Sequence, residues 1–566
     1  MKSVSGKNWE EISVNNRQLE KIKIETDLFE LISKIILYRN FDKSEILSIK
    51  NEIDIFNPFL QKKDFLQSFK TLHDVIENHG KILILGDYDV DGCISTSILI
   101  IFLRLLNLNP TYYIPNRIKD GYGASLKTIK KIIKNKPDLI IMLDCGSNSF
   151  ESINFLNSLD IKSIIIDHHE IYKPYPKTNN LINPKKNCDY NEYDYFCSAA
   201  LTYFFIDLYI KKTKSNIDFK LYLTYVLIAT VCDVMPLRKM NRLIAIKVLK
   251  SFNIKNYYVL NKIFELKEIK RPLTIEDFGY LIGPILNSAG RLKDPNIVVE
   301  LIINENKKIK EKIIKDLILL NEKRKKVELN MIKEFDFNKI RNSNNVIIEK
   351  SKNFNEGLIG LMANKLKDLF NKPSIVMAKS SDIYKASARS TTNFNIGKYI
   401  KNAIDMNFLI NGGGHNLAAG FSIKENKIKD FHDYIEKSFS KNFKKISHKY
   451  ASKISFNAIN KKFIDNLDKL SPFGHGNENP KFLLENVKIV KPKIIKKRYI
   501  SFFVKSHYTK IFPAISFDLL NSHLSKNILY NKNELTLVIE IKENVWNNKK
   551  NIQLIVSDII VPSNKA

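Results

Sequence analysis

The sequence predicts an α/β protein whose first large domain contains a parallel sheet. Short strands rich in β-branched residues, at 81–85, 138–143 and 162–166, are separated by amphipathic segments of helical length. Each strand is followed directly by an acidic motif, at the position where parallel sheets bind ligands. Because 566 residues are too many for one hydrophobic core, we expect several domains.

The motif after the first strand places carboxylates at alternate positions, Asp87, Asp89 and Asp91. These charges repel one another unless a cation lies between them, and oxygen ligands suit Mg²⁺ or Mn²⁺. A solvated, Asp-rich turn is the alternative, and this stretch alone favours neither. We expect Gly92 to close the loop and residues 93–106 to form a helix.

The other strands also end in potential metal ligands. Asp144 follows the second strand and Asp167-His168-His169 the third, while Asp233 follows the apolar segment 221–232. A single Asp after a strand is more often a helix N-cap. Four such coincidences instead indicate a site for one or two Mn²⁺ or Mg²⁺ ions that hydrolyses phosphoesters.

The predicted site has seven catalytic residues. They are Asp87, Asp89, Asp91, Asp144, His168, His169 and Asp233, and all except His169 are predicted metal ligands. We favour Asp89 and Asp91 as the carboxylates of the first motif that contact the ions. Asp167 is expected to fix the tautomer of an imidazole, as such carboxylates commonly do.

These motifs, in this order, resemble the DHH phosphoesterases and, within them, the single-strand-specific 5′→3′ DNA exonucleases. Ser198-Ala-Ala200, Asn241-Arg242 and the segment 283–292 fit the same pattern. Residues 300–335 are charged, periodically apolar and without Gly or Pro, which predicts a long helix. The resemblance implies that this helix joins two catalytic halves; a solvated helix without a role in substrate binding is the alternative. The implied domains are an N-terminal extension (1–60), the DHH domain (61–290), the connecting helix (291–335), a smaller α/β DHH-associated domain (336–440) and an OB-fold (441–566).

The second half contains candidate phosphate-binding elements. Glycines 412–414 before His415 let backbone amides approach a phosphate without a Cβ in the way, although a plain turn is the alternative. Arg389 offers the bidentate guanidinium fork that phosphate prefers. In the family such Ser-x-Arg and Gly-Gly-His elements engage substrate phosphates. The predicted substrate contacts are Arg117, Arg291, Ser387, Arg389, Gly413, Gly414 and His415, of which Arg291 fits a structural turn equally well.

Two positions depart from the family pattern. Asn355 stands where the family often has His, and His475 stands where Glu is usual. Because the metal-binding residues are all present, we expect slower or differently tuned activity at most.

The C-terminal region is a series of short alternating strands, at 499–504, 536–541 and 551–556, with basic residues between them. This pattern predicts a small β-barrel, and aromatic side chains beside Lys and Arg suit single-stranded nucleic acid. A β-domain with ordinary surface lysines is the alternative. The net charge of +31 favours nucleic acid over an anionic membrane, although general Lys enrichment contributes to it.

We expect a cytoplasmic protein. The five cysteines form no C-x-x-C pair, there is no secretory signal, and the apolar stretches are too short to span a membrane. The predicted function is metal-dependent 5′→3′ hydrolysis of single-stranded DNA, where the resemblance implies the polarity and the preference for DNA. A single-strand-binding protein and a helicase are candidate partners. The alternatives are a phosphoesterase of small nucleotides or short oligonucleotides, and a non-catalytic binding protein, which would not need the intact motif carboxylates.

Overall fold

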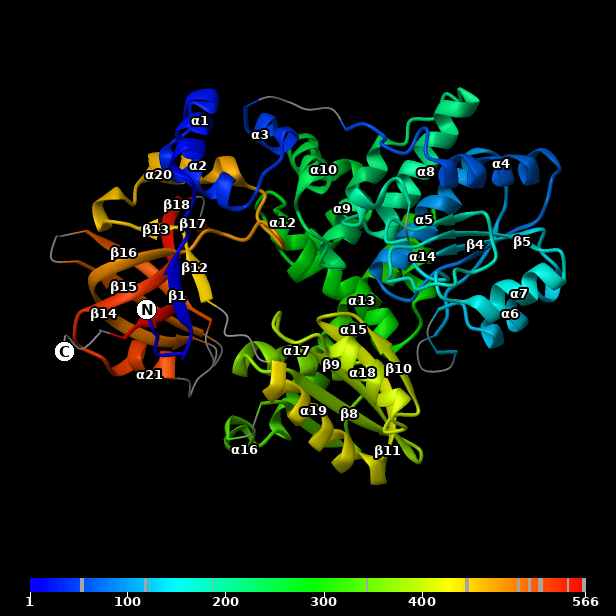
Figure 1. Cartoon of the computed structure of the whole chain (residues 1–566). Helices are drawn as coiled ribbons and strands as arrows, with labels where there is room; N and C mark the ends of the chain where they lie inside the picture. Colours follow the sequence, from blue (N-terminus) through cyan, green and yellow to red (C-terminus); the bar gives the residue numbers. More distant parts are fainter. Residues whose placement is uncertain are drawn as a thin grey trace. The chain divides into compact units, whose positions relative to one another are not determined.

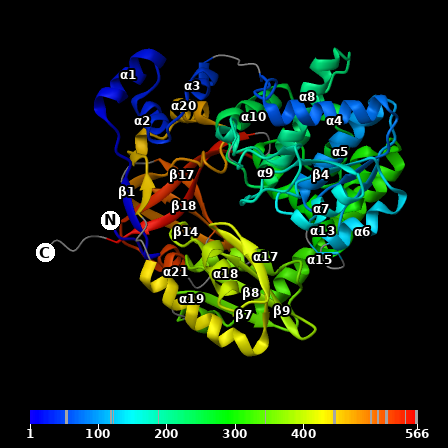
Figure 2. The ribbon, with the colours of Figure 1, turned by 45° about the vertical axis from the view of Figure 1, so that its right-hand side comes forward.

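The computed structural model (Figures 1 and 2) describes residues 1–50, 55–116, 120–121, 123–186, 188–342, 345–442, 447–495, 499–506, 510–517, 523–546 and 549–561. The chain separates into two units. Unit 1 comprises Met1–Asp54, Leu237–Leu243 and Lys444–Ala566, and unit 2 comprises Ile55–Pro236 and Ile244–Phe443. Helix α10, Lys239–Ser251, begins in unit 1 and ends in unit 2.

Unit 2 contains the predicted parallel sheet, with strand order β3-β2-β4-β5-β6. The strands are β2 (Ile82–Leu85), β3 (Thr111–Tyr113), β4 (Leu139–Leu143), β5 (Lys162–Ile166) and β6 (Leu181–Ile182). All residues of β2 and β4 are buried, because helices cover both faces of the sheet. Helices α6 (Leu126–Ile132) and α7 (Phe150–Ser158) lie on one face, and α4 (Lys63–Glu77), α5 (Val90–Leu105) and α8 (Ser198–Thr213) on the other. The predicted fold class is confirmed.

Helix α5 begins earlier than the sequence predicted. Its N-cap is Asp89, whose side chain accepts a hydrogen bond from Gly92 N at 3.1 Å, so Asp91 and Gly92 lie in the first turn instead of in a loop. A Cβ at Gly92 would lie 2.5 Å from the carbonyl oxygen of Asp87. Glycine is therefore required here because the helix passes so close to the preceding loop.

The predicted long helix at 300–335 is divided in two. Helix α14 ends at Ile303 and α15 begins at Lys307, because the side chain of Asn306 caps α15 by accepting from Lys308 N at 2.9 Å. The helices of this part of unit 2 are α9 (Leu223–Cys232), α11 (Tyr258–Leu266), α12 (Ile275–Asp277), α13 (Gly283–Leu292), α14 (Asn296–Ile303), α15 (Lys307–Lys333) and α16 (Phe337–Arg341).

The rest of unit 2 is a mixed sheet with strand order β10-β11-β9-β8-β7. The strands are β7 (Ile347–Ser351), β8 (Ser374–Ser380), β9 (Ile383–Arg389), β10 (Asn411–Gly414) and β11 (Ala418–Lys424), and the helices are α17 (Ile359–Phe370), α18 (Ile396–Asp405) and α19 (Ile428–Asn442). The glycines before His415 form the edge strand β10 rather than the predicted loop. A Cβ at Gly414 would lie 2.4 Å from Ala419 Cβ, whereas one at Gly413 would meet nothing within 4 Å. Gly414 thus allows close strand pairing, and Gly413 leaves an open approach to the backbone.

Unit 1 contains the predicted β-barrel, which the pairing of β14 with β17 closes. Its strands are β14 (Phe482–Ile495), β15 (Tyr499–Lys505), β16 (Ile511–Ser516), β17 (Leu535–Trp546) and β18 (Lys549–Ile560). The other elements of unit 1 are β1 (Asn8–Glu11), α1 (Asn16–Thr26), α2 (Glu30–Tyr38), α3 (Lys43–Lys50), β12 (Ser447–Tyr450), β13 (Ser452–Lys453), α20 (Lys461–Leu467) and α21 (His523–Tyr530). Strand β1 pairs with β12, and Trp9 Nε1 donates to the buried Asp558 of β18 at 2.9 Å. The N-terminal residues are therefore packed onto the barrel.

None of the helices in the described part of the chain combines the length and apolarity needed to cross a bilayer.

Candidate metal centre

The structure brings all seven predicted catalytic residues together at the carboxyl edge of the parallel sheet. They form three overlapping groups, each with its ligand atoms within 4.8 Å of one another. The groups are Asp144, His168 and His169; Asp91, His168 and Asp233; and Asp87, Asp89 and Asp144. Asp144 and His168 are shared between groups, so the residues form one continuous cluster.

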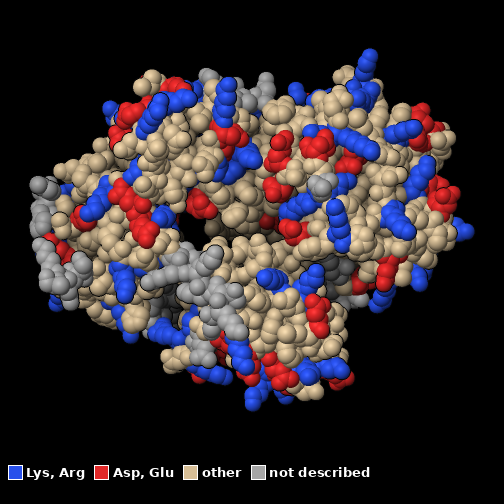
Figure 3. Space-filling view, in the orientation of Figure 1, with Lys and Arg blue, Asp and Glu red and all other residues tan. Residues whose placement is uncertain are grey.

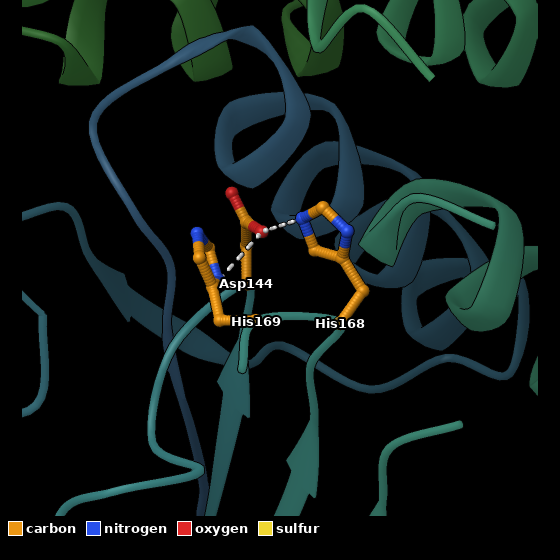
Figure 4. Close-up of side chains that lie close together, drawn as sticks. All are labelled: Asp144, His168 and His169. Carbon is orange, nitrogen blue, oxygen red and sulfur yellow. Dashed lines mark ion pairs between the residues drawn. The ribbon is translucent and has the colours of Figure 1, made fainter. Parts of the chain in front are cut away.

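Asp144 lies between the two imidazole rings (Figure 4). Its Oδ1 is 3.3 Å from His168 Nε2 and 3.8 Å from His169 Nδ1. His168 Nε2 also lies 3.4 Å from an oxygen of Asp233, which caps the C-terminus of α9. Asp144 has a left-handed backbone (φ 62°), a conformation that Asp tolerates better than most residues and that places its side chain at the strand end.

The N-terminus of α8 fixes two of the carboxylates. Both oxygens of Asp91 accept backbone N–H bonds of 2.8 Å, one from Ser198 and one from Ala199. Ser198 Oγ donates to Asp144 at 3.0 Å. The sequence placed Ser198 in the family pattern without assigning it this role. The sequence signal for this role was a Ser at the N-terminus of an apolar helical segment, soon after the third motif.

Asp167 contacts the ring of His169. Its Oδ1 lies 2.8 Å from His169 Nδ1, and its Oδ2 accepts from Ser147 N. Burial lowers the pKa of His169, but the charge and hydrogen bond of Asp167 outweigh burial and raise this pKa to about 9. Asn183 also holds this loop by donating to His169 O and Ser147 Oγ, and nothing in the sequence singled it out.

The cluster fits divalent cations. Burial, and then the neighbouring carboxylates, raise the pKa values of Asp87, Asp144 and Asp233 well above the usual range for Asp. Asp87 Oδ1 and both ring nitrogens of His168 are buried, and no described residue forms a hydrogen bond with any of these three atoms. Buried polar atoms without partners are rare and costly, and oxygen and imidazole ligands suit Mn²⁺ and Mg²⁺. The residues that would hold the metal are Asp87, Asp89, Asp91, Asp144, His168 and Asp233.

Without metal, the stability of the protein should fall as pH rises. Burial and the charge of Asp89 raise the pKa of Asp91 to about 6 from the usual value of 3.8. A raised folded-state pKa means that stability present below pH 3.8 is lost as pH rises through about 6, because the ionised carboxylates repel one another. Thermal unfolding in EDTA and in excess Mn²⁺ across this range should show the loss in EDTA and little of it with Mn²⁺. Parallel curves in the two conditions would contradict the metal-site assignment.

The predicted substrate residues form two groups in unit 2. His415 lies beside the metal centre, with its ring stacked 6.1 Å from that of His169. Arg389 and Ser387 lie at the start of α17, where a Cβ at Gly360 would be 3.4 Å from Arg389 Nη2. Arg291 donates to Gly357 O, next to the same turn, at 3.3 Å. Gly413 and Gly414 precede His415 on β10, and Arg117 lies outside the described residues.

Both departures from the family pattern have structural partners. Asn355 Oδ1 accepts from Gly357 N at 2.9 Å and so shapes the turn before α17. The backbone carbonyl of His475 accepts from Leu237 N at 2.8 Å within unit 1.

The outer face of the barrel carries aromatic and basic side chains. Phe503 on β15 and Phe517 after β16 are 42% and 63% exposed, and Tyr499 lies 6.1 Å from Phe517. Lys505 of β15 and Lys488 of β14 are exposed and directly paired across the strands. On the face seen in Figure 3, Lys and Arg are spread among Asp and Glu. Charge alone therefore does not locate a nucleic-acid path on this face.

Family models match most of the chain after residue 80. The DHH family N-terminal domain matches residues 81–230, the DHHA1 domain matches 343–441 and the RecJ OB domain matches 450–558. Among curated relatives, the single-stranded-DNA-specific exonuclease RecJ of Bacillus subtilis is 25% identical over 98% of this chain and 71% of its own length. The RecJ of Haemophilus influenzae is 29% identical over 64% of this chain and 67% of its own length.

Solved structures have the same fold. RecJ of Thermus thermophilus in complex with Mn²⁺ aligns with a TM-score of 0.83 at 19% identity, covering 98% of this chain and 80% of that one. The complex of that protein with Mg²⁺ aligns with a TM-score of 0.76. The three domain matches in chain order, together with the curated relatives, confirm the resemblance seen in the sequence: the chain belongs to the DHH family and has the domain composition of RecJ.

Proposed function

We propose that this protein is a metal-dependent exonuclease that removes nucleotides from the 5′ end of single-stranded DNA. The observation that carries the proposal is the convergence of seven acidic and histidine side chains on one sheet edge, where no described residue forms a hydrogen bond with either ring nitrogen of His168. Two curated relatives, which align with 98% and 64% of this chain, are named single-stranded-DNA-specific exonucleases. The 5′→3′ polarity comes from the family resemblance.

One group of residues forms the metal centre, and a second group binds the substrate. Bound Mn²⁺ or Mg²⁺ supplies charge that activates water and stabilises the phosphoryl oxygens. Asp91 and Asp144 are held in place by α8 for this purpose, and Asp167 holds His169 in one orientation. Arg389, Ser387 and Arg291 bind substrate phosphates near the start of α17, and His415 binds one beside the metal centre. Arg117 is proposed as a further phosphate contact.

The barrel of unit 1 binds single-stranded DNA. Its exposed aromatic rings stack on bases while the neighbouring lysines pair with phosphates. A small nucleotide substrate would not require such a face, and this observation argues against the small-nucleotide phosphoesterase alternative. We also propose a cytoplasmic location, a single-strand-binding protein and a helicase as partners, and the domain boundaries 1–60, 61–290, 291–335, 336–440 and 441–566.

Substrate length tests the proposal against its rival. With Mn²⁺, a long single-stranded oligonucleotide should be degraded much faster than either a dinucleotide or a blunt duplex of the same sequence. Preferential hydrolysis of the dinucleotide would favour the small-nucleotide phosphoesterase. Retention of intact single-stranded DNA without product would favour a non-catalytic binding protein.

A further inference from the structure

The last turn of α13 lies between the half of unit 2 that contains the parallel sheet and the half that contains the mixed sheet (Figures 1 and 2). Three consecutive residues there have different neighbours. A Cβ at Gly290 would lie 2.4 Å from the carbonyl oxygen of Tyr88, in the loop of the first acidic motif. A Cβ at Gly357, in the turn before α17, would lie 2.2 Å from the carbonyl oxygen of Arg291. Leu292 packs against the hydrophobic cluster to which α17 contributes.

The contacts at Gly290 and Gly357 bring backbone against backbone. Neither glycine has a left-handed conformation, so alanine could adopt both conformations and only the lack of space requires glycine. A side chain at such a contact could change its rotamer to absorb a displacement, but a backbone in a close-packed interior passes the displacement on. The contact at Gly290 reaches the metal centre directly, because Tyr88 lies between Asp87 and Asp89.

The contact at Gly357 leads to the proposed phosphate site. Arg291 Nη1 donates to the carbonyl oxygen of Gly357 at 3.3 Å, which adds a second link between α13 and this turn. Gly360 follows in the first turn of α17, where a Cβ would lie 3.1 Å from Ser387 Oγ and 3.4 Å from Arg389 Nη2. A continuous series of close contacts therefore connects the loop of the metal centre with Arg389.

We propose that the last turn of α13 is a rigid spacer that sets the distance between the metal centre and the phosphate site of Arg389. Gly290 and Gly357 are its positioning residues, and the inference rests on the proposed function. The metal centre must act on one phosphodiester while Arg389 holds a phosphate of the same strand. The distance between the two sites must therefore match the strand, and a misplacement of about 1 Å can slow a reaction by about 10²-fold.

Gly357→Ala tests the spacer without changing a residue of the metal centre. The new Cβ must move roughly 1 Å away from the carbonyl oxygen of Arg291 to reach an ordinary contact distance, and α17 should move with it. With Mn²⁺, kcat for single-stranded DNA should fall roughly 10- to 100-fold. The rate for bis(p-nitrophenyl) phosphate, a small phosphodiester that needs only the metal centre, should stay the same. The Mn²⁺ concentration that gives half-maximal activity should also stay the same.

Two further variants complete the test. Gly279→Ala is the control, because Gly279 is also helical and a Cβ there would lie at an ordinary 3.4 Å from Val231 Cγ1. Both activities of this control should equal those of wild type. Leu292→Ala loosens the contact that Gly357→Ala crowds, so it serves if Gly357→Ala does not fold. It should show the same selective loss of activity on single-stranded DNA.

A merely structural role of these residues predicts a different result. The Tm would fall, but kcat for single-stranded DNA would be unchanged at temperatures where circular dichroism shows the variant to be folded. That result, or equal losses of activity on the two substrates, would overturn the proposal. A wild type that hydrolyses bis(p-nitrophenyl) phosphate but leaves single-stranded DNA intact would instead contradict the proposed function, and this inference with it.

Discussion

Asp144→Asn is expected to lower the turnover of single-stranded DNA roughly 10³-fold or more at saturating Mn²⁺. Asp144 belongs to two of the three ligand groups and lies within 3.3 Å of His168, so its loss removes charge from the whole cluster. Asn has the same shape and tolerates the left-handed backbone that Asp144 adopts, so the fold should persist.

Two further measurements separate a chemical from a structural effect of Asp144→Asn. In EDTA the variant should be at least as stable as wild type, because one of several mutually repelling carboxylates has gone, and Mn²⁺ should stabilise it less. Asp160→Asn is the control: Asp160 is also left-handed (φ 57°) but exposed and away from the cluster, so activity should be unchanged. A fully active Asp144→Asn would end the metal-site assignment.

Arg389→Ala is expected to lower kcat/KM for single-stranded DNA by roughly 10- to 100-fold, as the loss of a hydrogen bond to a charged group of about 1.5–3 kcal/mol implies. Arg389 lies on β9 at the start of α17, with Ser387 Oγ 3.3 Å from its Nη1. Because this residue is not part of the metal cluster, the Mn²⁺ concentration that gives half-maximal activity should stay the same.

Separate measurement of KM and kcat shows whether Arg389 contacts the substrate or has a structural role. A contact with a substrate phosphate predicts a raised KM, whereas a merely structural role predicts a lower Tm and an altered Mn²⁺ dependence. Arg341→Ala, at an exposed Arg of the same domain, should behave like wild type. Equal losses in the two variants would indicate a general charge effect and remove Arg389 from the substrate site.

The parallel sheet was predictable because its strands are buried on both faces and therefore appear in the sequence as unbroken apolar runs. The acidic motifs were predictable for a related reason, since parallel strands place their carboxyl ends at one edge. The residue at which α5 begins was harder to predict. Asp89 is the N-cap of this helix and also belongs to a ligand group, and the sequence pattern predicted a loop over the whole acidic motif. The edge strand β10 was also not predicted. Glycines are poor strand formers, and these glycines form a strand because they pair with β11.

Contacts between residues distant in sequence were the least predictable. Ser198 reaches Asp91 from 107 residues away, and β1 pairs with a strand more than 400 residues later. No local pattern encodes such pairings, because they depend on how the units fold as a whole. The metal-site cluster could nevertheless be predicted, because each of its ligands follows a strand or helix that is recognisable in the sequence.

The central claim is that the clustered carboxylates and histidines cut single-stranded DNA from its 5′ end with the help of a divalent metal. The most direct measurement follows single-stranded DNA labelled at either the 5′ or the 3′ end, digested with Mn²⁺ or with EDTA. With Mn²⁺, the 5′ label should appear as mononucleotide at the earliest times while the 3′ label remains on progressively shorter strands, and EDTA should stop both. Early release of the 3′ label, or digestion that continues in EDTA, would contradict the account.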